Sequence, residues 1–130
     1  MKKLVLIASI VIMGASCVKY QEFPLEGTWN LETEINLLSD QTRIVRDTIR
    51  YVKGEILEIL PEGAYHLRMS DRTVSGTWKR KDNGHTIELD QGSETTTDAH
   101  IQLLSEKRLI IFTLITKGDE TFKTTLHLSR

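Results

Sequence analysis

The sequence predicts an all-β protein: an antiparallel up-and-down meander of eight or nine strands, closed into a small barrel, behind an N-terminal signal peptide. Two observations lead to this fold class. Apolar and polar side chains alternate through most of residues 28–128, which is the period of half-buried strands. The stretches between these segments are also too short for the crossovers that parallel strands need, which take about a dozen residues. We therefore expect each strand to run antiparallel to its neighbour.

The first predicted strand, residues 28–37, alternates most regularly. We expect Trp29, Leu31, Thr33, Ile35 and Leu37 on one face, and Thr28, Asn30, Glu32, Glu34 and Asn36 on the other. Later strands are expected, in chain order, at residues 44–52, 56–60, 64–69, 73–79, 87–89, 101–103, 109–116 and 122–128. The turns between them include Pro61-Glu62-Gly63 and Asp82-Asn83-Gly84, because Pro presets φ and Gly tolerates a positive φ.

A meander of this length has two exposed edges unless its first and last strands pair. Closure into a barrel removes both edges, so a closed barrel is the expected architecture. An open β-sandwich is the alternative.

Residues 1–16 have the order of a secretory signal. Met1-Lys2-Lys3 is basic, Leu4 to Met13 is an uncharged run of ten residues that is apolar except for Ser9, and Gly14-Ala15-Ser16 is a small-residue stretch. The run is about half the length that a membrane-spanning helix needs, which is about 20 residues. Cys17, the one cysteine of the chain, follows immediately.

This order resembles a bacterial lipoprotein signal with its lipobox, although Gly14 stands where that family usually has Leu. The resemblance implies that residues 1–16 are removed and that Cys17 is acylated by chains such as palmitate. Residues 17–24 would then be a tether, and residues 25–130 the domain. Some lipoproteins exposed on the cell surface carry an acidic run just after the cysteine. Glu22 is the one acidic residue of the tether, so the periplasmic face of the outer membrane is favoured over the cell surface. The alternative is ordinary secretion.

A second resemblance begins at Gly27-Thr28-Trp29, which opens the first strand. Lipocalins and related calycins begin their barrels with Gly-x-Trp. The later Gly76-Thr77-Trp78 and the turn at Pro61 are similar to the lipocalin-like domains of small Gram-negative lipoproteins. The resemblance implies that Gly27 and Trp29 belong to the closed end of the barrel, where an arginine near the last strand packs on the tryptophan. Arg130 is the late arginine, and the second sequence block of lipocalins has no counterpart here.

Composition and spacing argue against several functions. The 17 Lys and Arg nearly balance the 18 Asp and Glu, so no single-sign field attracts nucleic acid. A single cysteine excludes a Cys-rich zinc site. His66, His85, His100 and His127 lie on separate segments without metal-ligand spacing. We therefore predict no catalytic residue, no metal and no cofactor.

A lipocalin-like barrel implies a small apolar ligand. Residues 64–69 and 73–79 are expected to pair as a hairpin whose inner face would line the ligand site. That candidate site comprises Tyr65, Leu67, Met69, Val74 and Trp78, with space left beside Gly76. The alternative is a barrel filled by side chains, which binds or inhibits an envelope protein. We expect Arg46, Asp47 and Arg50 to lie on a solvated strand face. The alternative is a charged patch inside or outside the barrel mouth.

Overall fold

The computed structural model describes residues 23–52, 54–90, 92 and 96–130. Strands follow one another through these ranges: β1 (Gly27–Ser39), β2 (Ile44–Arg50), β3 (Ile56–Ile59), β4 (Ala64–Arg68), β5 (Thr73–Lys81), β6 (Thr86–Asp90), β7 (Thr96–Leu104), β8 (Arg108–Lys117) and β9 (Glu120–Ser129). A short 3-10 turn, Asp82–Gly84, joins β5 to β6. The segments predicted from alternation are therefore strands, with ends shifted by a few residues.

All strand pairs are antiparallel, and the sheet closes. The order is β2-β1-β3-β4-β5-β6-β7-β8-β9, and β1 also pairs with β9. β1 and β3 to β9 thus form a closed barrel of eight strands, to which β2 is added at its margin. The predicted fold class, an antiparallel meander closed into a small barrel, is confirmed.

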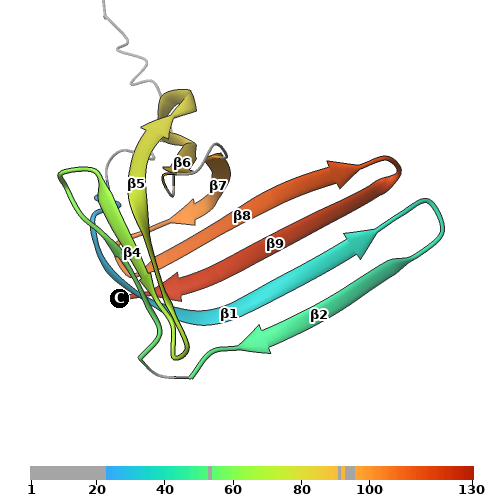
Figure 1. Ribbon diagram of the computed structural model, residues 1–130, viewed down its shortest axis with the longest axis horizontal. Helices are drawn as coiled ribbons and strands as arrows, with labels where there is room; N and C mark the ends of the chain where they lie inside the picture. Colours follow the sequence, from blue (N-terminus) through green and yellow to red (C-terminus); the bar gives the residue numbers. More distant parts are fainter. Residues whose placement is uncertain (1–22, 53, 91, 93–95) are drawn as a thin grey trace, which may run out of the picture.

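The barrel carries a long arm, in which β8, β9, β1 and β2 run side by side away from the other strands (Figure 1). The arm comprises residues 33–39 of β1, all of β2, residues 113–117 of β8 and residues 120–124 of β9. It exists because β1 pairs with β3 only over Gly27–Asn30 and with β2 from Thr33 onward. β1 is therefore shared between the barrel and the arm.

A β-bulge lies in β1 where the barrel passes into the arm. Leu31 pairs with Leu128 of β9, but the next register position pairs Thr33 with His127, so Glu32 is an extra residue. An extra residue in one strand reverses the facing of every side chain that follows it.

Because of the bulge, the predicted directions of the side chains in the second half of β1 are wrong. Glu34 pairs with Leu126, which shares a face with the buried Leu128, so Glu34 lies on the continuation of the interior face. Thr33, Ile35 and Leu37 lie on the outer face instead. A pattern of period two cannot show a bulge, because Leu31 and Thr33 remain two positions apart.

The closed end of the barrel is built around Trp29, which is 0% exposed. Its indole Nε1 donates a hydrogen bond to the Leu25 carbonyl at 2.8 Å. The Arg130 guanidinium lies over the ring, 4.0 Å from the centroid. The same guanidinium group donates to the carbonyls of Pro24, Glu26 and Glu106 at 3.0, 3.1 and 2.7 Å. The arginine expected from the lipocalin resemblance therefore packs on this tryptophan.

The core continues from Trp29 through the barrel. Its buried members come from nearly every barrel strand: Leu25, Trp29, Leu31, Leu57, Ile59, Tyr65, Ile87, Ala99, Ile101, Leu104, Leu109, Ile111 and Leu128. Several side chains of the arm are exposed instead, among them Ile44, Val45, Leu114 and Ile115. The barrel is the packed part of the fold, and the arm is an extension of its sheet.

The expected signal peptide, residues 1–16, and Cys17 lie outside the described residues. Within the described ranges, no helix is both long and apolar enough to cross a membrane.

Replacing Trp29 by Ala should destabilise the fold by about 3–5 kcal/mol, the usual loss for a fully buried aromatic side chain. Chemical denaturation of the two proteins measures the difference in the free energy of unfolding. Thr77→Ala, at an exposed position of β5, is the matched control. A loss below about 1 kcal/mol for Trp29→Ala would show that this residue does not hold the closed end together.

Candidate functional site

The hairpin predicted to line an interior ligand site is present. Tyr65 pairs with Gly76, and Leu67 pairs with Val74, so these side chains share the interior face with Trp78. Tyr65 is buried, whereas Leu67, Val74 and Trp78 are half-buried and pack against the core. Met69 lies one residue beyond β4 and is half-buried, at the end of the barrel where β4 turns into β5. We call this end the open end.

The space expected beside Gly76 is occupied. A Cβ atom added at Gly76 would lie 2.0 Å from the Asp90 carbonyl oxygen and 2.8 Å from Cε1 of Tyr65. Glycine is needed here because β6 and the Tyr65 ring approach its backbone so closely. The expectation of open space was therefore wrong, since the sequence could not show which neighbour covers a glycine.

Polar side chains form a chain on the interior face where the open end of the barrel passes into the arm. Tyr51 donates its hydroxyl hydrogen bond to the Glu34 carboxylate, and Asn36 Nδ2 donates to the same carboxylate at 2.8 Å. Thr124 Oγ1 in turn donates to Asn36 Oδ1 at 2.8 Å. Burial raises the pKa of the Tyr51 phenol, and the hydrogen bond to Glu34 raises it further. The bulge at Glu32 brings Glu34 and Asn36 into this chain, so the sequence pattern did not predict it.

Glu55 is the one acidic residue among the buried side chains of the described part of the chain, with 7% exposure. Its Oε1 accepts a long hydrogen bond from the Ser70 amide at 3.4 Å, and its Oε2 has no protein partner. The carboxylate fastens the turn after β4 to the start of β3. A buried oxygen without a partner is costly, so this position is a place where a ligand or water could add a hydrogen bond.

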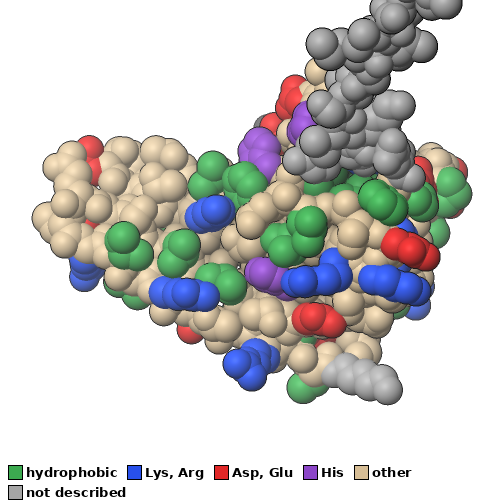
Figure 2. Space-filling view, turned by 180° about the vertical axis from the view of Figure 1, so that it is seen from behind, with side chains coloured by type: hydrophobic (Ala, Val, Ile, Leu, Met, Phe, Trp, Pro, Cys, Tyr) green, Lys and Arg blue, Asp and Glu red, His purple; other side chains and the backbone are tan. Residues whose placement is uncertain are grey.

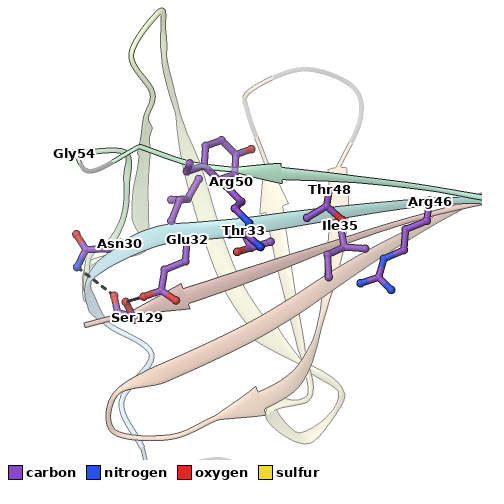
Figure 3. A pocket seen from close by; sticks show the side chains of 11 residues that line it. Asn30, Glu32, Thr33, Ile35, Arg46, Thr48, Arg50, Gly54 and Ser129 are labelled. Carbon is purple, nitrogen blue, oxygen red and sulfur yellow. Dashed lines mark hydrogen bonds between the residues drawn. The ribbon is translucent and has the colours of Figure 1, made fainter.

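A hollow lies on the outside of the barrel, along β1 and β2. It is a groove of about 730 Å³, within the range of small-ligand sites. Its lining combines hydroxyls, apolar side chains and charges: Asn30, Leu31, Glu32, Thr33, Ile35, Arg46, Thr48, Arg50, Tyr51, Gly54 and Ser129. Figure 3 shows Arg46 and Ile35 extending on the same side of the two strands. We call this hollow the β1–β2 groove.

Charge in the β1–β2 groove comes mainly from two arginines. Arg50 pairs across the strands with Thr33, Arg46 pairs with Leu37, and Thr48 lies between them on the same face. Among the described residues, neither guanidinium has a salt bridge or a side-chain hydrogen-bond partner. Glu32 lies at the barrel end of the groove, and its Oε1 accepts a hydrogen bond from Ser129 Oγ at 2.5 Å.

The three charged residues are exposed, as expected of a solvated strand, but they are divided between two faces of β2. Arg46 and Arg50 line the outer groove, whereas Asp47 lies on the opposite face with Val45 and Ile49. Period-two alternation in residues 44–50 could have separated these residues. The groove itself could not be foreseen, because it depends on the bulge that places Thr33 and Ile35 on the outer face.

The histidines do not gather into a site. His66 Nδ1 lies 2.7 Å from Ser75 Oγ, and His100 packs against Phe112 with its ring centroid 5.1 Å away. Within the described ranges, no cluster of three or more His, Cys, Asp or Glu side chains could hold a metal ion. The candidate site is therefore taken to be the β1–β2 groove, which combines arginine, hydroxyl and apolar groups.

Replacing Gly76 by Ala tests the close packing on the interior face of β5. The added methyl group must displace the backbone of Asp90, so we expect the free energy of unfolding to fall by about 1–3 kcal/mol. Thermal or urea denaturation measures it, with Thr77→Ala on the outer face as the control. A neutral or stabilised Gly76→Ala protein would indicate an empty space beside this glycine and restore the interior ligand site.

Comparison with known proteins gives a structural likeness. No family model and no curated protein matches the sequence. Among solved structures, a bovine odorant-binding protein, a deswapped triple mutant, is similar with 14% sequence identity and a TM-score of 0.43. The likeness covers 80% of this chain and 72% of that one. The description of the fold depends on the chain's own features: the closed antiparallel meander and the contact of Arg130 with Trp29.

Proposed function

We propose that this protein is a lipid-anchored binding protein of the Gram-negative cell envelope, and that it binds its partner on the arm rather than inside the barrel. The observation that carries the proposal is the β1–β2 groove, where the guanidinium groups of Arg46 and Arg50 lie without a described partner. Unpaired arginines on one face of a strand favour an anionic partner. No catalytic step is assigned to the site.

The proposed tether enters the domain at the closed end. Arg130 holds the carbonyl of Pro24 at 3.0 Å, next to Trp29. The tip of the arm, at Ser39, is twelve positions along β1 from Gly27. At about 3.3 Å per residue, this is roughly 40 Å along the strand. A membrane anchor at Cys17 would therefore leave the arm far from the point of attachment and accessible to a partner.

Packing and exposure both favour the arm as the binding surface. Tyr65 and the Asp90 carbonyl fill the space beside Gly76. The arm instead exposes hydrophobic side chains and Lys or Arg side chains close together, as Figure 2 shows from one side. All residues of β2 are exposed.

A second candidate function is the binding of a small apolar ligand at the open end. The partnerless Oε2 of buried Glu55 favours it, together with the half-buried side chains of Leu67, Met69 and Val74. Trp78 fluorescence tests this candidate by titration of the delipidated protein with a fatty acid and a retinoid-like polyene. Saturable quenching that Met69→Trp abolishes would support it. If neither compound quenches the Trp78 fluorescence, this second candidate function is excluded.

Membrane attachment is tested by Cys17→Ser. Two or more acyl chains give firm attachment, so their loss should move the protein from the membrane fraction to the soluble fraction. Fractionation of the producing cells, with mass spectrometry of the N-terminus, measures the change. A variant that stays with the membrane would contradict anchoring through Cys17.

Binding on the arm is tested by photo-cross-linking in the cell envelope. A photoreactive residue at Thr48, inside the β1–β2 groove, should form a discrete adduct, and the same residue at Thr77, on exposed β5, should not. Arg46→Glu with Arg50→Glu should abolish the adduct at position 48, because the substitutions reverse the charge of the groove. Equal adducts at both positions, or no adduct at position 48, would contradict the proposal.

A further inference from the structure

Among the described strands, β2 is terminal and offers a free edge to a partner strand. Tyr51 donates its backbone N–H to the Glu32 carbonyl of β1 at 3.0 Å. In an antiparallel pair, the N–H and C=O of one residue point to the same neighbour, and the direction alternates along the strand. Val45, Asp47 and Ile49 therefore bond to β1. The backbone groups of Arg46, Thr48 and Arg50 point to the open edge, since β2 is the terminal strand of the sheet.

The side chains of these edge residues lie in the β1–β2 groove. Arg46, Thr48 and Arg50 thus present both their free backbone groups and their side chains to an incoming strand. Arg46 and Arg50 are four positions apart, or about 13 Å along an extended chain. A small anion cannot pair with the backbone groups along this whole length of edge, whereas an extended segment can pair with them and also reach both guanidinium groups.

Charge opposes the pairing of β2 with a second copy of itself. An antiparallel pair centred on the strand places Asp47 directly opposite Asp47 of the second copy. A shift to the next register in either direction places Arg46 opposite Arg46, or Arg46 opposite Arg50. Like charges directly opposite each other destabilise a strand pair. The edge is therefore suited to a strand of opposite charge rather than to itself.

We propose that an extended acidic segment of a partner protein adds to β2 as an antiparallel strand. Its carboxylates, at two positions four residues apart, would lie opposite Arg46 and Arg50, and a small polar side chain between them would lie opposite Thr48. On the other face, apolar side chains of the segment would pack beside exposed Val45 and Ile49. The inference rests on the proposed binding at the arm and specifies the chemistry of the partner. Main-chain hydrogen bonds supply affinity in this mode, and alternate side chains supply specificity.

Synthetic peptides test the proposal against the purified full chain in mild detergent. The probe is the seven-residue peptide Thr-Glu-Val-Thr-Lys-Glu-Val with blocked ends and a fluorescent label, measured by anisotropy. Its glutamates face Arg46 and Arg50, and its lysine faces Asp47. We expect saturable binding that weakens as salt is added. A peptide of the same composition with its glutamates three positions apart should bind at least about tenfold more weakly, a difference of about 1.4 kcal/mol.

Protein variants separate strand addition from simple charge attraction. Arg46→Glu and Arg50→Glu should each weaken binding of the probe at least about tenfold, whereas Arg108→Glu, at an exposed arginine of β8, should not. Thr48→Pro removes one N–H from the open edge without removing a bond to β1, and proline is tolerated at such edge positions. It should abolish binding while the circular dichroism spectrum stays that of a β-protein. Thr48→Val keeps the N–H and should bind nearly as well.

Several results would overturn the proposal. Equal binding of both peptides, or unchanged binding by Thr48→Pro, would show unspecific charge attraction. Displacement of the probe by inorganic phosphate or free glutamate at the same concentration would indicate a small-anion site. A concentration-dependent dimer in sedimentation, lost in Thr48→Pro, would make a second copy the occupant. If the probe fails but the Thr48 photo-adduct in the envelope forms, binding at the arm stands and only the acidic strand is excluded.

Discussion

The pairing of β1 with β9 is the interaction on which the rest of the structure depends. It closes the barrel between the first and last strands and continues, beyond the bulge, into the arm. Arg130 fastens the closed end by lying over Trp29 and by donating hydrogen bonds to the carbonyls of Pro24, Glu26 and Glu106. Without this closure, the side of β1 that faces β9 would be an open edge from Asn30 to Ser39.

The extra residue Glu32 turns one strand into two surfaces with different roles. Before the bulge, Trp29 and Leu31 point into the core. After it, Glu34 joins the polar chain at the open end, and Ile35 lies in the outer groove. A bulge of this kind redirects side chains at the rim of a barrel. The groove and the polar chain at the open end are therefore two consequences of one local irregularity.

Alternation and turn chemistry were sufficient to predict the strands, the hairpin of β4 with β5, and the closed barrel. Trp29 could be placed in the core because its neighbours alternate and Gly27 precedes it. The site could not be predicted to the same extent, because the alternation of apolar and polar residues shows neither a bulge nor which neighbouring group packs against a glycine. Tyr65 and the Asp90 carbonyl fill the space beside Gly76, which only the three-dimensional packing shows. The acylation of Cys17 remains a prediction.

Hydrogen exchange along β2 in the purified protein tests the central claim, that this strand pairs on one side and is open on the other. We predict slow exchange for the amides of Val45, Asp47 and Ile49, which bond to β1, and fast exchange for those of Arg46 and Thr48. Nuclear magnetic resonance resolves these neighbouring amides one by one. Equal protection of all five amides would show that the edge is already covered. Uniformly fast exchange would show that β2 does not pair with β1, and either result would contradict the account.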